Sequence, residues 1–119
     1  MAKKTLVVDD DPLNVKLIEV NLEKQGFEVI NAVNGKEGLE TVKKEKPGLI
    51  ILDVEMPEMD GYAFLNEFNK LGELKNIPVV VLTSHQDMQP IFQRHGVKAY
   101  LTKPLDSAKL IKITQQYLE

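Results

Sequence analysis

Short runs of apolar residues alternate along this chain with longer segments in which apolar positions recur every three or four residues. The runs are rich in valine, isoleucine and leucine and span residues 6–8, 27–30, 49–52, 79–82 and 99–101. Runs that are apolar at nearly every position are typical of strands covered on both faces, as in a buried parallel sheet. The pattern therefore predicts five βα units in one α/β domain, with helices on both faces of the sheet.

The residues after two of the apolar runs carry local signals for a helix start. Asn34 followed by Gly35 is typical of a β-hairpin, whereas Asn34 followed three residues later by Glu37 is typical of a helix N-terminus. We favour the helix, because a helical pattern follows and a strand pattern does not. Asp11 before Pro12 is likewise expected to cap a helix, since proline is common at the first helical position.

The composition is that of a globular domain, with 43% hydrophobic and 28% charged residues among 119. The chain has no cysteine, which excludes disulfides, thiolate metal sites and thiol nucleophiles. Its net charge is -3 without a basic cluster, which argues against direct binding of nucleic acid. It opens without a signal peptide and has no apolar stretch near the roughly 20 residues that span a bilayer, so we expect a cytoplasmic protein without a membrane partner.

Polar side chains follow four of the five predicted strands. In chain order they are Asp9, Asp10 and Asp11, then Asp53, then Thr83 and Ser84, then Thr102 and Lys103. In an open parallel α/β sheet, ligands bind beyond the carboxyl ends of the strands. Taken singly, threonine and serine are common in turns, and a lysine is commonly a solvated charge. Their combination at four strand ends is what indicates a functional site.

The acidic residues indicate the chemistry of that site. Carboxylates at one edge repel one another by about 4 kcal/mol per pair at about 4 Å in an effective dielectric of about 20, so a cation is expected. Oxygen ligands favour a hard ion, and Mg2+ suits an open, partly hydrated site better than Mn2+ or Ca2+. Mg2+ also binds phosphoryl oxygens, Lys103 adds a positive charge, and Thr83 adds a hydroxyl donor. The set predicts phosphoryl transfer to a carboxylate.

These residues resemble the receiver domain of response regulators, and the resemblance runs along essentially the whole chain. The matching blocks are residues 6–11, 52–61, 82–84 and 100–104. Their number, order and spacing make the resemblance far more specific than an isolated acidic pair. It implies a doubly wound, flavodoxin-like (βα)5 fold with a parallel sheet of strand order 2-1-3-4-5, formed by residues 1–119 as one receiver domain.

The resemblance also implies roles for individual acidic residues. Asp53 would be the phosphoacceptor, and Asp10 and Asp53 would bind Mg2+ directly. Asp9 would act on the ion through bound water, and the backbone carbonyl of Glu55 would be a further ligand. Glu55 and His85, each two residues beyond a matched site residue, would flank the path of water to the phosphoryl group and so tune dephosphorylation.

Three further matched residues would form the switch. Lys103 would pair with the phosphoryl group, and Thr83 would move to hydrogen-bond it. Tyr100 would change rotamer with Thr83, although a half-buried strand tyrosine needs no such role. The Lys103 to Pro104 peptide bond would be cis, as X-Pro bonds allow.

The function implied by the resemblance is that of a two-component or phosphorelay switch. A sensor histidine kinase or a histidine phosphotransfer protein would donate the phosphoryl group to Asp53. The phosphorylated form would control an output partner or a fused effector domain, and it would dephosphorylate itself slowly rather than turn over an external substrate. The alternative is a pseudo-receiver that binds partners independently of phosphorylation.

The first predicted helix carries two apolar stripes at helical spacing. One consists of Val15, Ile18 and Leu22, and the other of Leu13, Leu17 and Val20. One stripe must pack on the sheet. The second either lies buried between neighbouring helices or is exposed beside the acidic site, where it would dock a phosphotransfer helix as the equivalent helix does in the receiver family.

The fourth predicted helix is short. Thr83 and Lys103 are twenty positions apart, about two fewer than in the usual receiver pattern. Pro90 is tolerated only in the first turn of a helix and Gly96 marks its end, which leaves fewer than two turns. We therefore expect a labile fourth helix and an output surface that departs from that of the family.

Overall fold

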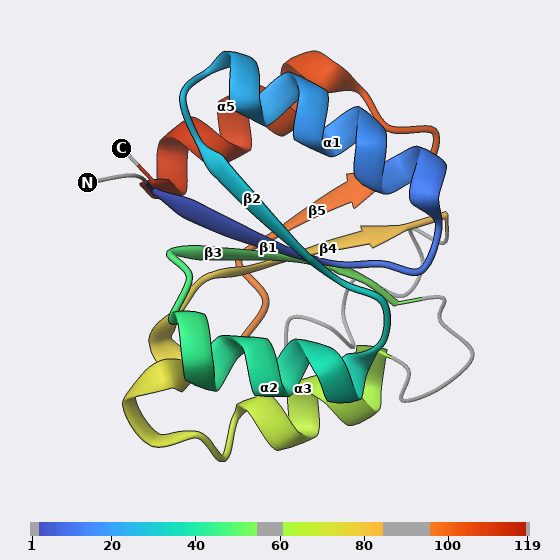
Figure 1. Ribbon diagram of the computed structural model, residues 1–119. Helices are drawn as coiled ribbons and strands as arrows, with labels where there is room; N and C mark the ends of the chain where they lie inside the picture. Colours follow the sequence, from blue (N-terminus) through green and yellow to red (C-terminus); the bar gives the residue numbers. More distant parts are fainter. Residues whose placement is uncertain (1–2, 55–60, 85–95, 119) are drawn as a thin grey trace.

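The protein is represented by a computed structural model, of which residues 3–54, 61–84 and 96–118 are described. Its centre is a five-stranded sheet in the order β2-β1-β3-β4-β5, in which every neighbouring pair is parallel (Figure 1). The strands are β1 (Lys4–Val8), β2 (Glu28–Ala32), β3 (Leu49–Asp53), β4 (Val79–Thr83) and β5 (Ala99–Thr102). The predicted strands and the strand order 2-1-3-4-5 are therefore confirmed.

Helices cover both faces of this sheet, as the uniformly apolar strands predict. The described helices are α1 (Pro12–Lys24), α2 (Gly35–Glu45), α3 (Gly61–Phe68), the 3-10 helix η1 (Gly72–Asn76) and α5 (Ser107–Leu118). Helices α1 and α5 lie on one face, and α2 and α3 lie on the other (Figure 1). No helix in the described part of the chain is long and apolar enough to cross a membrane.

The central strand β3 shows why the sheet needs both layers. All five of its residues are buried. Ile50 and Leu52 belong to the core on the α2 and α3 side, whereas Leu49 and Ile51 belong to the core on the α1 and α5 side. Alternate residues of a strand point to opposite faces, so a run of four apolar residues contributes to two separate cores.

The two predicted helix caps are present. Asp11 has an extended backbone and its Oδ1 accepts a hydrogen bond from the Leu13 amide at 3.0 Å, with Pro12 at the start of α1. Asn34 caps α2 in the same way: its backbone is extended, and its Oδ1 accepts a hydrogen bond from the Glu37 amide at 2.8 Å. The helix interpretation of Asn34 is therefore confirmed, and the hairpin interpretation is wrong.

Helix α1 buries only one of its two apolar stripes. Val15, Ile18 and Leu22 pack into the core on the α1 and α5 side. In the other stripe Leu13 is 81% exposed, and Leu17 and Val20 are each 39% exposed. The alternative in which neighbouring helices bury both stripes is wrong, and the exposed stripe of Leu13, Leu17 and Val20 is a surface of the molecule.

Helix α2 approaches the sheet closely at Gly38. A Cβ atom at this position would lie 3.0 Å from a methyl group of Val8 and 3.2 Å from the ring of Phe64. Both neighbours are fully buried and have little room to move. The absence of a side chain at Gly38 lets α2 pack directly against the end of β1, where the acidic residues begin.

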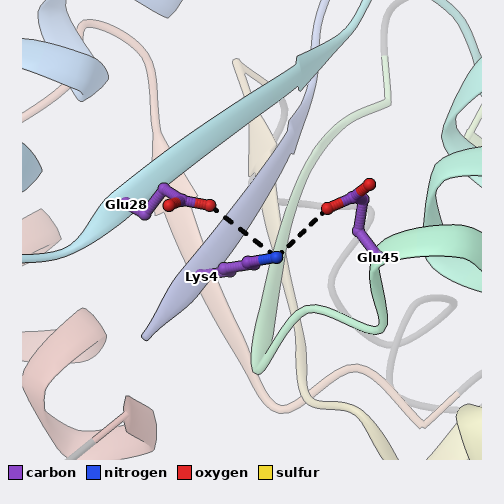
Figure 2. Close-up of polar contacts among 3 residues, drawn as sticks. All are labelled: Lys4, Glu28 and Glu45. Carbon is purple, nitrogen blue, oxygen red and sulfur yellow. Dashed lines mark hydrogen bonds and ion pairs between the residues drawn. The ribbon is translucent and has the colours of Figure 1, made fainter. Parts of the chain in front are cut away.

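An ion-pair network lies at the opposite, amino-terminal end of β1. Lys4 Nζ is 3.1 Å from Glu45 Oε1 and 3.9 Å from Glu28 Oε2, so one lysine links β1 to β2 and to the end of α2 (Figure 2). All three side chains are partly exposed, and such pairs stabilise a fold by about 1 kcal/mol at most. The network therefore supports the local packing.

Thr5 provides a test of polar burial in the core. Its hydroxyl is fully buried in β1 and has no hydrogen-bond partner among the described residues. Valine has nearly the same shape, so Thr5→Val removes an unsatisfied polar group without leaving a cavity. We expect the free energy of unfolding to rise by about 1 kcal/mol, measured as a higher urea midpoint with an unchanged m-value.

Thr114 offers a matched control for that exchange. It is also fully buried, but its hydroxyl donates to the Leu110 carbonyl at 2.8 Å. Thr114→Val should therefore give no comparable gain, because the hydroxyl that it removes is satisfied. A loss of stability in Thr5→Val would contradict the proposed cost of its buried hydroxyl.

Candidate functional site

The carboxyl ends of the central strands bring the predicted polar residues to one edge of the sheet. Asp53 is the last residue of β3 and pairs with Leu82 of β4. Thr83 is the last residue of β4 and pairs with Thr102 of β5. Asp9 directly follows β1. The expectation that these residues gather at one edge, which rests on the parallel direction of the strands, is confirmed.

Three carboxylates form a cluster at this edge, here called the acidic cluster: Asp9, Asp10 and Asp53. Each contributes an oxygen, and the three oxygens lie within 4.8 Å of one another. Asp9 and Asp53 are buried, with 1% and 2% of their surface exposed, whereas Asp10 is exposed. The cluster is thus walled by protein on one side and open to water on the other.

Burial perturbs the carboxyl group of Asp9. Burial raises the pKa of Asp9 from 3.8 to about 7. The hydrogen bond from the Asp11 amide lowers this pKa, the negative charge of Asp53 raises it further, and the positive charge of Lys103 lowers it. The Asp11 amide donates to Oδ1 of Asp9 at 2.9 Å. Oδ2 of Asp9 is buried without a hydrogen-bond partner among the described residues.

The donor set of the acidic cluster fits Mg2+. An unpartnered buried carboxylate oxygen lies close to two further carboxylates, and a cation there would satisfy the oxygen and offset the repulsion. All three donors are oxygens, as a hard cation prefers. The exposed side at Asp10 leaves room for the water molecules that Mg2+ usually retains.

Lys103 brings a positive charge to the acidic cluster. Its Nζ lies 3.2 Å from Asp53 Oδ1, and its side chain is 25% exposed. The Lys103 amide donates to the Thr83 carbonyl at 3.0 Å, which holds the start of the loop after β5 against the end of β4. The Lys103–Pro104 peptide bond is cis, as expected.

Thr83 and Tyr100 lie on the same face of the sheet. Tyr100 pairs with Val81, and Val81 and Thr83 point the same way because they are two positions apart in β4. Thr83 is fully buried, whereas Tyr100 is half-buried, packs against the core on the α2 and α3 side, and has a pKa raised by burial. The two side chains are therefore diagonal neighbours on β4 and on the edge strand β5.

Comparison with known proteins decides the family. A family model described as the response regulator receiver domain matches residues 5–115. The chain belongs to this family. The receiver domain is 34% identical over 111 residues to protein PilH of Pseudomonas aeruginosa, with 92% of each chain covered. Receiver domains are signalling modules of two-component systems that interact with histidine kinases and effector domains.

Two solved structures illustrate the likeness in three dimensions. Vibrio cholerae chemotaxis protein CheY4 superposes on this receiver domain with a TM-score of 0.91 at 29% identity, covering 99% of this chain and 100% of that chain. The receiver domain of the sensor histidine kinase PA1611 from Pseudomonas aeruginosa has a TM-score of 0.89 at 26% identity, covering 99% and 98%. That structure contains a magnesium ion coordinated in its active-site cleft.

Some residues singled out in the sequence lie outside the described part of this receiver domain. They are Glu55, with its expected carbonyl ligand, and His85, together with residues 90–95 of the expected short fourth helix. The described part nevertheless brings together four of the expected site residues: Asp9 and Asp10, which follow β1, Asp53 at the end of β3, and Lys103, which follows β5.

Sequence reasoning missed Asn31 of this receiver domain. Its side-chain nitrogen donates to the carbonyls of Val7, Asp9 and Ala32 at 3.0, 3.2 and 3.1 Å. Asn31 thus contacts the backbone of an acidic cluster residue from the neighbouring strand. The available signal was an asparagine inside an apolar strand segment, a position where this residue type is uncommon.

Proposed function

We propose that this receiver domain, formed by residues 1–119, accepts a phosphoryl group on Asp53 in the presence of Mg2+. The observation that carries the proposal is the position of Asp53: it is buried in the acidic cluster, with the ammonium group of Lys103 3.2 Å from its Oδ1. A buried carboxylate at a strand end with an adjacent fixed cation is suited to nucleophilic attack on phosphorus.

The proposed reaction is a transfer from a phosphohistidine donor. An oxygen of the Asp53 carboxylate bonds to phosphorus while the phosphorus–nitrogen bond of the donor breaks, and the departing imidazole takes up a proton. Lys103, which lies beside Asp53, then pairs with a phosphoryl oxygen. Mg2+, when bound by Asp10 and Asp53, by the Glu55 carbonyl and by Asp9 through water, would neutralise charge on the phosphoryl oxygens.

The proposed response to phosphorylation runs through Thr83 and Tyr100. A phosphoryl group on Asp53 offers acceptor oxygens beside the end of β4, and the Thr83 hydroxyl moves to donate to one of them. Because Tyr100 is the diagonal neighbour of Thr83, this movement changes the space available to the tyrosine side chain. Tyr100 changes rotamer in response and alters the surface that an output partner recognises.

The lifetime of the phosphorylated state is proposed to depend on Glu55 and His85. Each follows a site residue by two positions, Asp53 and Thr83 respectively. Side chains at these positions would flank the approach of water opposite the bond to Asp53. The domain therefore acts as a timed switch that dephosphorylates itself slowly, not as an enzyme with an external substrate.

Phosphorylation itself is tested with a small-molecule donor. The protein is incubated with acetyl phosphate and Mg2+, and its intact mass is measured with and without a chelator. We expect the mass of one phosphoryl group to be added only when Mg2+ is present. No addition under either condition would contradict the proposal and favour a pseudo-receiver that binds partners without phosphorylation.

The exposed stripe of Leu13, Leu17 and Val20 is the proposed docking surface for the phosphohistidine donor. Helix α1 starts two residues after Asp10, so this stripe begins beside the open side of the acidic cluster. Its apolar side chains have the i, i+4, i+7 spacing that a partner helix can contact. A histidine on such a helix would reach Asp53 from the solvent side.

If the phosphohistidine donor docks on this stripe, Leu13→Gln should slow phosphoryl transfer from protein donors only. Transfer from a histidine kinase or phosphotransfer protein should slow about tenfold or more, because the most exposed apolar contact of the surface is lost. Stability should change by less than about 0.5 kcal/mol, since Leu13 is 81% exposed. Phosphorylation by acetyl phosphate, which needs no docking, should be unchanged when both rates are measured on the same preparation.

Val33→Gln serves as the control for this substitution. Val33 is 48% exposed and lies outside α1, so the same exchange of apolar for amide side chain should leave both rates unaffected. Equal slowing with both donors in Leu13→Gln would place its effect at the acidic cluster. No slowing with the protein donor would exclude α1 as the docking surface.

A further inference from the structure

Asn31 is a polar residue in β2 whose side chain donates hydrogen bonds to backbone carbonyls. Its Nδ2 lies 3.0 Å from the Val7 carbonyl oxygen, 3.2 Å from that of Asp9 and 3.1 Å from that of Ala32. A carbonyl oxygen only accepts hydrogen bonds, so the atom that faces all three must be the amide nitrogen. Its two hydrogens are shared among the three acceptors.

These bonds hold the chain where β1 ends and the acidic cluster begins. The last residue of β1 is Val8, and Asp9 is the first residue beyond it. The Asp9 amide donates to the Ala32 carbonyl at 2.9 Å, and the Asp9 carbonyl accepts from Asn31. Both backbone polar groups of Asp9 are therefore hydrogen-bonded to β2: the amide to a backbone carbonyl and the carbonyl to the Asn31 side chain.

The hydrogen bonds to the Asp9 backbone also affect the positions of the carboxylates. Oδ1 of Asp9 accepts from the Asp11 amide, and Asp10 lies between these two residues in the chain. A shift of the Asp9 backbone would move its carboxylate and the backbone that carries Asp10. Mutual repulsion among the three close carboxylates favours such a shift, so a fixed backbone is needed to keep their oxygens together.

Core packing does not explain an asparagine at this position. The Asn31 side chain is exposed, and asparagine is disfavoured in strands relative to β-branched residues. A valine or threonine there would suit the strand better but could not donate to the carbonyls of β1 in the same way. The hydrogen bonds to Val7 and Asp9 are the feature that distinguishes Asn31 from those residues.

We propose that Asn31 is a positioning residue that fixes the backbone at Asp9 and thereby holds the acidic cluster ready for a divalent cation. The inference rests on the proposed function, in which this cluster binds Mg2+. Asn31 touches neither the cation nor the phosphoryl group. It acts from the next strand as a partner of a residue of the site, as outer-sphere groups commonly do around metal ions.

The test compares Asn31→Ala and Asn31→Asp with matched changes at Asn21. The Asn21 side chain also donates to a backbone carbonyl, that of Leu17 at 2.8 Å, but it lies within α1 and makes this bond inside its own helix. Mg2+ affinity is measured by calorimetry on each full-length protein, under conditions where circular dichroism shows all of them folded. Both Asn31 variants should bind Mg2+ about tenfold more weakly than wild type, and both Asn21 variants should bind as wild type does.

Asn31→Asp separates positioning from simple electrostatics. The aspartate keeps the shape of asparagine, cannot donate to the three carbonyls when ionised, and adds a negative charge near the cluster. Charge attraction alone would tighten Mg2+ binding, whereas lost positioning weakens it. Tighter binding by Asn31→Asp, or binding by Asn31→Ala within twofold of wild type, would overturn the proposal.

Hydrogen exchange on the metal-free protein provides a readout that does not depend on Mg2+. The amides of Asp9 and Asp11 should exchange faster in Asn31→Ala than in Asn21→Ala, because the backbone between β1 and α1 is released. Unchanged exchange at both amides would overturn the inference while leaving the proposed function intact. Wild-type protein that bound no Mg2+ would instead overturn the proposed function, and the role of Asn31 in cation binding with it.

Discussion

Asp53→Asn is expected to abolish phosphorylation completely. The amide keeps the size of the carboxylate and an acceptor oxygen 3.2 Å from Lys103, so the fold should be retained. The amide oxygen is a poor nucleophile, however, and the variant has no carboxylate at the end of β3 to bond to phosphorus. Intact mass after incubation with acetyl phosphate and Mg2+ should show only unmodified protein.

Asp106→Asn is the matched control for this substitution. Asp106 is exposed and its Oδ1 accepts from the Ala108 and Lys109 amides at the start of α5, a role that asparagine also fills. This variant should be phosphorylated like wild type. If Asp53→Asn still gained a phosphoryl group, another acid of the cluster would be the acceptor, and the assignment of Asp53 would be wrong.

Asp9→Asn is expected to stabilise the metal-free protein. The buried Asp9 carboxylate has one unpartnered oxygen and lies close to Asp53, and these surroundings raise its pKa from 3.8 to about 7. Asparagine removes the buried charge, keeps an acceptor for the Asp11 amide, and places an NH2 group where the unpartnered oxygen was. At pH 8 the free energy of unfolding should rise by about 2 to 4 kcal/mol.

The pH dependence of this gain follows from the direction of the shift. The folded protein holds a proton on Asp9 up to about pH 7, whereas the unfolded chain releases it near 3.8. The folded state therefore binds more protons between these values, and the stability of metal-free wild type falls as the pH rises from about 4 to about 7. The advantage of Asp9→Asn should vanish near pH 4 and be complete at pH 8, as measured by urea unfolding with a chelator present.

Asp10→Asn provides the comparison for Asp9→Asn. Both changes remove one carboxylate from the acidic cluster, but Asp10 is exposed and water already solvates its charge. Asp10→Asn should therefore stabilise the metal-free protein much less, while both variants lose Mg2+ affinity. Equal stabilisation by the two variants would show that burial of Asp9 is not the source of the effect.

Mg2+ should reverse the order of stability between wild type and Asp9→Asn. A ligand that binds only the folded state stabilises it in proportion to the logarithm of its concentration over the dissociation constant. Wild type gains this contribution because its acidic cluster is complete, whereas Asp9→Asn gains little. The Asp9 carboxylate would thus destabilise the metal-free protein and stabilise the Mg2+-bound protein.

The sequence alone predicted the five strands, two helix starts and the residues that form the acidic cluster. Uniformly apolar runs predicted strands buried on both faces, and β3 shows this at every residue. Asp11 and Asn34 predicted two helix starts correctly because a cap depends on residues within one turn. The gathering of Asp9 and Asp53 followed from the parallel direction of successive strands. Strand order came from the family resemblance, since local patterns do not specify which strands are neighbours.

Only the tertiary structure decided features that depend on residues far apart in the chain. Helical spacing gave α1 two equivalent apolar stripes, and the packing of the sheet and α5 selected Val15, Ile18 and Leu22 for burial. The ion pair between Lys103 and Asp53 joins residues 50 positions apart. The raised pKa of Asp9 and the bonds of Asn31 likewise exist only once β1 lies between β2 and β3, because burial and hydrogen-bond geometry are set by neighbours in space.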